Sequence, residues 1–136
     1  MATRSRIGYT DPATGYTCSV YCHWDGYPSN NGRILLEHYN SLERVKALVA
    51  LGDISVLEPS IDCPEGHSFD NPVDGHTIFY GRDRGEEDVS AIVQSDGREA
   101  VSGEEYGYLF VNGAWKYNYD GSDLYDLTPE EAKINR

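Results

Sequence analysis

The chain has 136 residues, of which 39% are apolar, and a formal net charge of −12 at pH 7. This length predicts a single domain, residues 1–136, with an ordinary hydrophobic core, and no apolar stretch reaches the roughly 20 residues of a membrane span. Residues 1–52 contain five Lys/Arg and four Asp/Glu, whereas residues 53–136 contain six and nineteen, which argues against direct nucleic-acid binding because that binding depends on Lys and Arg.

The first predicted element is a β-hairpin. The turn-forming run Asp11-Pro12-Ala13-Thr14-Gly15 separates two β-prone segments. Alternation along the second segment defines one face with Tyr16, Cys18, Val20 and Cys22, and a second face with Thr17, Ser19, Tyr21 and His23. The first face is more apolar, so we expect it to point toward the core.

Two short helices, or one kinked helix, are predicted next. Asn31 is a candidate N-cap for residues 32–39, and Ser41 is a good N-cap for a second segment. Apolar residues in that second segment repeat with a period of 3.6 as far as Gly52, a typical C-cap.

The remaining chain predicts short strands. Residues 53–76 contain three prolines and are expected to be loop-rich, with short strands at 77–81 and 91–93. The clearest hairpin joins residues 106–111 to residues 114–119 through Asn112-Gly113, which suits a type I′ turn. An acidic tail follows at about 120–136, with a helix start at Thr128. Together these elements predict an α+β fold, in which a pair of short helices packs on one face of an antiparallel β-sheet.

A structural zinc site is a less favoured interpretation of four possible ligands, Cys18, Cys22, Cys63 and His67. On one strand, Cys18 and Cys22 would lie about 13 Å apart, too far to share a metal bound at roughly 2.0–2.3 Å. We therefore expect no metal and no cofactor. The chain has three cysteines, an odd number, which favours a reducing cytosol over a disulfide framework.

No catalytic residues are predicted. The sequence lacks a P-loop, a dinucleotide fingerprint, Gly-x-Ser-x-Gly and His-Glu-x-x-His. His67 and Asp70 flank Ser68, but proximity along the chain does not make a triad. The expectation is a protein that is not an enzyme.

An aromatic stretch and two arginines form a candidate ligand-binding set: His23, Trp24, Asp25, Tyr27, Arg82 and Arg84. Aromatic rings can stack on a base, and an arginine can bind a phosphate through two hydrogen bonds, so the set suits a nucleotide. Arg4 and Arg6 could add positive charge. The favoured interpretation of most of these residues is structural, with His23 and Asp25 as the members expected to be functional. In it, Trp24 and Tyr27 cover the edge of the core, and the two arginines neutralise the neighbouring acids.

Eight acidic residues form a candidate partner-binding face: Glu86, Glu87, Asp88, Glu104, Glu105, Asp120, Asp123 and Asp126. Such a face attracts basic surfaces, including the nucleic-acid-binding clefts of other proteins. Alternatively, the charge only keeps a tyrosine-rich domain soluble.

Several segments resemble a family of small proteins encoded by bacteriophages and prophages: MATRSRI, VYCHWDGYPSNNG, ILLEHY, ALGDIS, YGRDRGE and the YLFVNGAWKY hairpin. The resemblance implies an accessory phage protein of unassigned activity in the host bacterial cytoplasm. By analogy of context and size, we expect it to counter a host defence system by binding a defence protein through the acidic face. The alternative is a sponge that sequesters a nucleotide signal, with a pocket completed in a homo-oligomer, and a structural phage part is a third possibility.

Overall fold

The computed structural model describes residues 2–133 of the chain. The strands are β1 (Ser5–Thr10), β2 (Thr17–Cys22), β3 (Ile54–Val56), β4 (Ile78–Phe79), β5 (Ile92–Gln94), β6 (Tyr106–Val111), β7 (Ala114–Tyr119) and β8 (Tyr125–Asp126). The helices are η1 (Pro28–Gly32), α1 (Arg33–His38), α2 (Leu42–Ala50), α3 (Tyr80–Arg84), α4 (Gly97–Ala100) and η2 (Glu131–Lys133).

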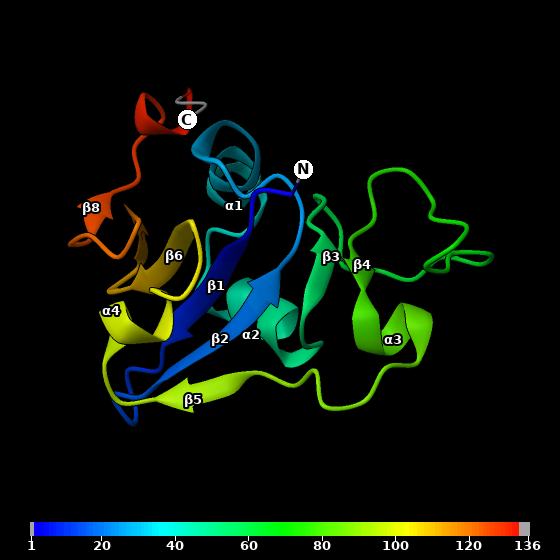
Figure 1. The fold of residues 1–136 in the computed structure, drawn as a ribbon, viewed down its shortest axis with the longest axis horizontal. Helices are drawn as coiled ribbons and strands as arrows, with labels where there is room; N and C mark the ends of the chain where they lie inside the picture. The colour runs from blue at the N-terminus through cyan, green and yellow to red at the C-terminus, as the bar shows by residue number, and fades with distance from the viewer. Residues whose placement is uncertain (1, 134–136) are drawn as a thin grey trace.

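All eight strands belong to one sheet, shown in Figure 1. The order is β4-β3-β2-β1-β6-β7-β8, and β5 pairs with β2 beside β3. The pairs β1–β6 and β2–β3 are parallel, while the other named pairs are antiparallel. The fold is therefore α+β with a mostly antiparallel sheet, as predicted.

Both predicted hairpins are present. β1 and β2 pair in the register Arg6↔Tyr21, and β6 and β7 pair from Tyr106↔Tyr119 to Val111↔Ala114. Asn112 and Gly113 have φ values of 54° and 79°. A type I′ turn requires positive φ at both central positions, so the Asn-Gly prediction is confirmed.

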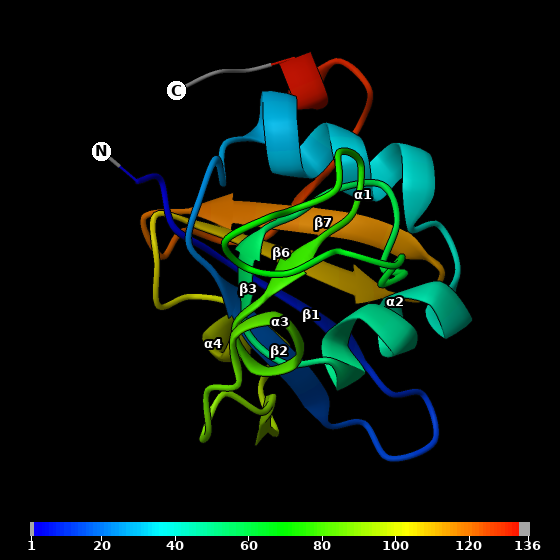
Figure 2. The ribbon, with the colours of Figure 1, turned by 90° about the vertical axis from the view of Figure 1, so that its right-hand side faces the viewer.

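The predicted helical pair covers one face of the sheet (Figures 1 and 2). The Ser41 hydroxyl accepts a hydrogen bond from the Arg44 N–H at 3.2 Å, which confirms the cap of α2. The predicted Asn31 cap is wrong, because the π-helical turn η1 runs directly into α1. Asn31 is buried, and its amide donates to Ser5 Oγ at 3.2 Å and to Cys22 Sγ at 3.4 Å.

The main core lies between these helices and the sheet. Its members are the buried residues Ile7, Val20, Cys22, Ile34, Leu35, Tyr39, Val45, Leu48, Val49, Ile54, Leu57, Phe79, Tyr106, Tyr108, Phe110, Trp115, Tyr117, Leu127 and Ala132. Two buried rings also satisfy backbone carbonyls: Trp115 Nε1 donates to Tyr39 O at 2.8 Å, and the Tyr108 hydroxyl donates to Gly26 O at 2.6 Å.

The opposite face of the sheet is partly covered by α4, which the sequence did not predict. Ser19 Oγ donates to Ala100 O at 3.0 Å, and Ser19 is fully buried. The approach is close at Gly107 on β6, where an added Cβ would lie 2.1 Å from Val101 O. Tyr16, expected on the core face, is 52% exposed instead, because it precedes the first paired residue of β2.

Several elements differ from the expectation. β3 lies in the predicted loop, and α3 begins inside the predicted strand 77–81. The described part of the acidic tail packs against the domain: β8 pairs with β7, and Leu127 and Ala132 enter the core. Residues 134–136 of the predicted tail lie outside the described residues.

Candidate functional site

The face of β1 and β2 opposite the main core carries a polar cluster. Because Ile7, Val20 and Cys22 point into the core, Arg6 and Tyr21 point the other way. The Arg6 guanidinium donates to Ser19 Oγ at 3.1 Å and to Ser19 O at 3.0 Å.

The same cluster extends toward β3 and the end of β2. The Tyr21 N–H donates to Asp53 Oδ1 at 3.0 Å, and the Tyr21 hydroxyl lies 2.6 Å from His23 Nδ1. Sequence reasoning included His23 but missed Asp53, because Asp53 joins the group only through the pairing of β2 with β3.

Electrostatics in this cluster do not favour an anionic ligand. Burial lowers the pKa of Arg6, while the charges of Asp53 and Glu104 raise it. Burial raises the pKa of Asp53, although the hydrogen bond from the Tyr21 N–H and the charge of Arg6 act to lower that pKa. The Arg6 guanidinium is already bonded to Ser19, and the negative charges of Asp53 and Glu104 act on it.

The aromatic stretch turns outward after β2. The His23 and Trp24 N–H groups donate to Ile54 O and Ser55 O at 3.0 and 3.1 Å, and Asp25 has a φ of 54°. Trp24 is 40% exposed, with its ring edge-on to His23 at 4.9 Å between centroids. The expectation that Trp24 covers the core is wrong, because this backbone turn directs the ring to solvent.

The other aromatic candidate lies on the same turn. Tyr27 is partly buried against the core, and its hydroxyl donates to Asp25 Oδ1 at 3.5 Å. The prediction that Tyr27 covers the core edge is therefore confirmed, while Asp25 is exposed.

The two candidate arginines are used inside the protein. Arg82 on α3 binds Asp83 through Nε and Nη2 at 2.8 and 3.1 Å and also donates to Thr77 O at 3.2 Å. Arg84 stacks on the Phe69 ring at 4.6 Å and lies 3.5 Å from Glu86. The two arginines therefore neutralise the neighbouring acids Asp83 and Glu86, as the structural interpretation predicted. β3 lies between β2 and β4, so a strand separates α3 from the aromatic stretch.

Asp83 is the centre of a buried cluster that the sequence did not reveal. Its carboxylate accepts the Phe79 N–H at 2.8 Å and lies 3.4 Å from His67 Nε2 and 3.9 Å from Cys63 Sγ. Burial raises the pKa of Asp83, but hydrogen bonds from Arg82 and Phe79 and the charges of Arg82 and His67 outweigh burial and hold that pKa below its ordinary value. The cluster fastens loop 59–76 to α3.

The zinc alternative is not supported within residues 2–133. No group of three or more His, Cys, Asp or Glu in this range has a geometry that could hold a metal. Cys22 is buried in the core, where burial raises the pKa of its thiol to about 11, whereas Cys63 and His67 surround Asp83. The structure therefore does not bring Cys18, Cys22, Cys63 and His67 together.

The eight predicted acidic residues fall into two groups. Glu86, Glu87 and Asp88 line a depression with the C-terminal end of α2, next to α3. The others lie on β8 or in the loops beside β6 and β7, where the Asp120 N–H donates to Glu105 O at 3.0 Å. The sheet order separates these two groups, because β4, which leads into α3, and β8 lie at opposite edges of the sheet.

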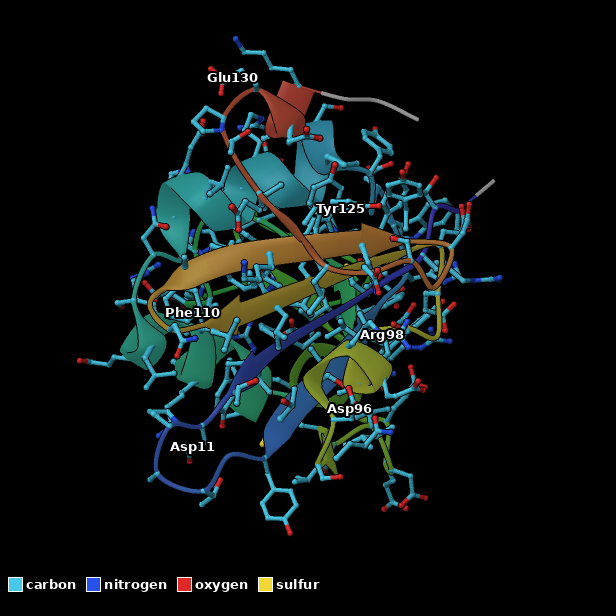
Figure 3. The ribbon with its side chains drawn as sticks, turned by 90° about the vertical axis from the view of Figure 1, so that its left-hand side faces the viewer. Asp11, Asp96, Arg98, Phe110, Tyr125 and Glu130 are labelled. Atoms are coloured by element: carbon cyan, nitrogen blue, oxygen red, sulfur yellow. The ribbon has the colours of Figure 1, made fainter. Side chains whose placement is uncertain are left out.

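Three tyrosines accompany the second acidic group. The Tyr125 ring on β8 lies 6.2 Å from Tyr117 and 6.0 Å from Tyr119, both on β7. Figure 3 looks onto this edge, with Tyr125 beside β7 and Glu130 just before η2. The spacing of Tyr117 and Tyr119 on one strand face was a readable signal that the sequence analysis did not use.

Two small cavities open at this edge. One, of about 180 Å³, is lined by Tyr117, Tyr119, Tyr125 and Glu131. The other, of about 200 Å³, is lined by Glu105, Tyr106, Tyr119 and Asp120. We call the combined surface of Glu105, Tyr119, Asp120, Tyr125 and Glu131 the acidic tyrosine surface.

Two larger cavities lie elsewhere. One of about 480 Å³ is lined by residues of α1 and the η2 region, and one of about 400 Å³ lies between the two hairpin turns and the start of α2. None of the predicted site residues lines either cavity, so neither provides the expected nucleotide pocket.

No protein-family model, curated protein sequence or solved structure matches the chain. Within residues 2–133, no helix combines the length and the apolar character that a membrane crossing requires.

Proposed function

We propose that this chain is a non-enzymatic binding protein whose acidic tyrosine surface occupies a basic surface of another protein. The resemblance noted in the sequence supports a phage setting. There, the partner is a defence protein in the cytoplasm of the bacterial host, and its blockade counters that defence. The observation that carries the proposal is the grouping of carboxylates and tyrosines around two cavities at the β6–β7–β8 edge.

The composition of this edge supports protein binding. Tyrosine gives a large contact area with few rotatable bonds, and it is enriched in protein interfaces. Two nearby cations contact carboxylates: Lys116 lies 2.6 Å from Asp126, and Arg98 lies 3.5 Å from Glu99. Glu105, Asp120 and Glu131 add further negative charge. The net field at this edge is therefore negative and would steer a basic partner.

The geometry around His67 supports a binding role over a hydrolytic one. His67 Nδ1 accepts the Val73 N–H at 3.0 Å, and its Nε2 faces Asp83. Ser68 Oγ accepts the Asn71 N–H at 3.1 Å. Both ring nitrogens are directed at structural partners, so this histidine is not arranged to activate the neighbouring serine.

A pull-down with charge-neutralised variants tests the proposal. One variant changes Asp120 to Asn and Glu105 and Glu131 to Gln, and a matched control changes Glu86 and Glu87 to Gln and Asp88 to Asn, so both lose three charges. We expect a basic host protein to bind the wild type and the control at low salt. It should be lost at 1 M salt, where the screening length is about 3 Å, and lost from the first variant. Equal retention by both variants would refute the proposal.

A second candidate function is nucleotide binding on the exposed ring of Trp24, which is 40% exposed next to His23. Stacking of a base on an aromatic ring contributes about 1–3 kcal/mol to binding. The internal use of Arg82 and Arg84 removes the phosphate-binding part of this hypothesis. Thermal shift with a nucleotide panel tests it, since a bound nucleotide at a hundredfold excess over Kd stabilises by about 2.7 kcal/mol.

A further inference from the structure

The cavity between β7, β8 and η2 has aromatic walls and one carboxylate. The rings of Tyr119 and Tyr125 are nearly parallel, with 16° between their planes and 6.0 Å between their centroids. Tyr125 is 47% exposed, so part of its ring is available to a ligand. Tyrosine faces carry negative electrostatic potential and attract cations.

The carboxylate of this cavity is held in place. The hydroxyl of the buried Tyr117 donates a hydrogen bond to Glu131 Oε2. The Thr128 hydroxyl accepts the Glu131 N–H at 3.2 Å, which fixes the start of this helical turn. The Glu131 carboxylate therefore lines the cavity beside the tyrosine rings.

The second cavity shares Tyr119 and adds two more carboxylates. Glu105 Oε1 accepts the Arg4 N–H at 3.3 Å, and the Asp120 N–H donates to Glu105 O at 3.0 Å. These bonds join the two acidic residues across the end of the β6–β7 pair. Both cavities thus present carboxylates beside one common ring, Tyr119.

We propose that these cavities are paired receptor sites for two basic side chains of a partner protein, with an arginine guanidinium placed against Tyr119 and Tyr125 beside Glu131. At about 180 and 200 Å³, each cavity is smaller than the roughly 300–1,000 Å³ of small-molecule sites, so it fits one side chain. Arginine is preferred to lysine because its planar guanidinium stacks on aromatic rings and binds a carboxylate through two hydrogen bonds. The inference rests on the proposed function and names the chemistry that the acidic tyrosine surface recognises.

The test uses a small probe and the full chain. N-acetyl-Arg-Arg-amide is titrated into ¹⁵N-labelled protein, and its citrulline counterpart serves as an uncharged control of similar shape. We expect the arginine dipeptide to shift the backbone amides of Tyr117, Tyr119, Asp120 and Tyr125, and the citrulline dipeptide to leave them unchanged. Tyr125→Ala and Glu131→Gln should each weaken binding about tenfold, the size of a partly desolvated cation–π or charged contact.

Matched variants control for general effects on folding and charge. Tyr16→Ala removes another exposed tyrosine, and Glu43→Gln removes another exposed carboxylate, and neither residue lines the two cavities. Both should bind like the wild type. Unmoved amides at millimolar dipeptide, equal binding of the citrulline form, or equal loss in the controls would overturn the inference.

The outcome separates this inference from the proposed function. If the pull-down finds a basic partner held by the acidic residues while the dipeptide leaves the amides unmoved, the receptor sites are refuted and the proposed function stands. If the dipeptide binds as described but no basic partner depends on these acids, the receptor sites stand and the proposed function is refuted.

Discussion

The two tryptophans give a direct test of the packing. Trp115 is 3% exposed, lies edge-on to Phe110 at 5.3 Å between centroids, and donates to Tyr39 O at 2.8 Å. Truncation of such a ring typically costs about 3–5 kcal/mol, and the hydrogen bond contributes about 1 kcal/mol within that loss. Trp24 is 40% exposed and contacts His23 edge-on, so Trp24→Ala should cost at most about 1 kcal/mol.

Urea unfolding followed by far-UV circular dichroism measures both effects without relying on tryptophan fluorescence. Trp115→Ala should lose a large part of a typical stability of about 5–15 kcal/mol. Trp115→Phe keeps most of the volume but leaves the Tyr39 carbonyl unpaired, and it should cost an intermediate amount of roughly 1–3 kcal/mol. The reasoning is refuted if Trp24→Ala destabilises as much as Trp115→Ala, because Trp24 would then belong to the core.

Three further changes test other parts of the fold. Asp83→Asn should cost about 3 kcal/mol or more at pH 7, since it removes the carboxylate partner of the mostly buried Arg82 guanidinium. Because the pKa of Asp83 is lowered in the folded state, this difference in unfolding free energy should be full above about pH 4 and shrink as pH falls through the folded-state pKa; a constant difference down to pH 2 would contradict the assignment. In thiol labelling of the folded protein, exposed Cys63 should react readily, whereas Cys22 should react only on unfolding. Loss of the fast-reacting thiol in the Cys63→Ser variant would confirm that Cys63 reacts first. Gly107→Ala should lower the midpoint of thermal unfolding strongly through overpacking of about 1–3 kcal/mol, whereas Gly103→Ala, with its nearest neighbour 3.8 Å from the added Cβ, should not; similar midpoints would refute the close approach of α4.

Local signals account for the parts of the fold that the sequence predicted. The Asn112-Gly113 turn, the Ser41 cap and the alternation of β2 depend on residues close in the chain, and all three are present in the structure. Each rests on a backbone conformation or a side-chain bond that a few neighbouring residues specify by themselves. The strongly negative C-terminal region is likewise a property of composition alone.

Contacts between distant segments decided the rest. β3 is three residues long, and only its pairing with β2 and β4 makes it a strand. α4 is only four residues long; Asp96 caps its start by accepting the Glu99 N–H at 3.1 Å, and Gly107 leaves room for its C-terminal end against the sheet. Trp24 faces solvent because the chain turns toward β3 after β2, which no alternation within the aromatic stretch indicates.

The same distinction applies to the candidate sites. The sequence by itself determined which residues are acidic, aromatic or basic. Only the tertiary structure decided that Arg82 is committed to Asp83, that the acids divide between opposite edges of the sheet, and that Tyr119, Tyr125 and Glu131 line one cavity. The physical reason is that a cavity and a paired charge are properties of side chains brought together by strand order, and strand order depends on the whole core rather than on any one segment.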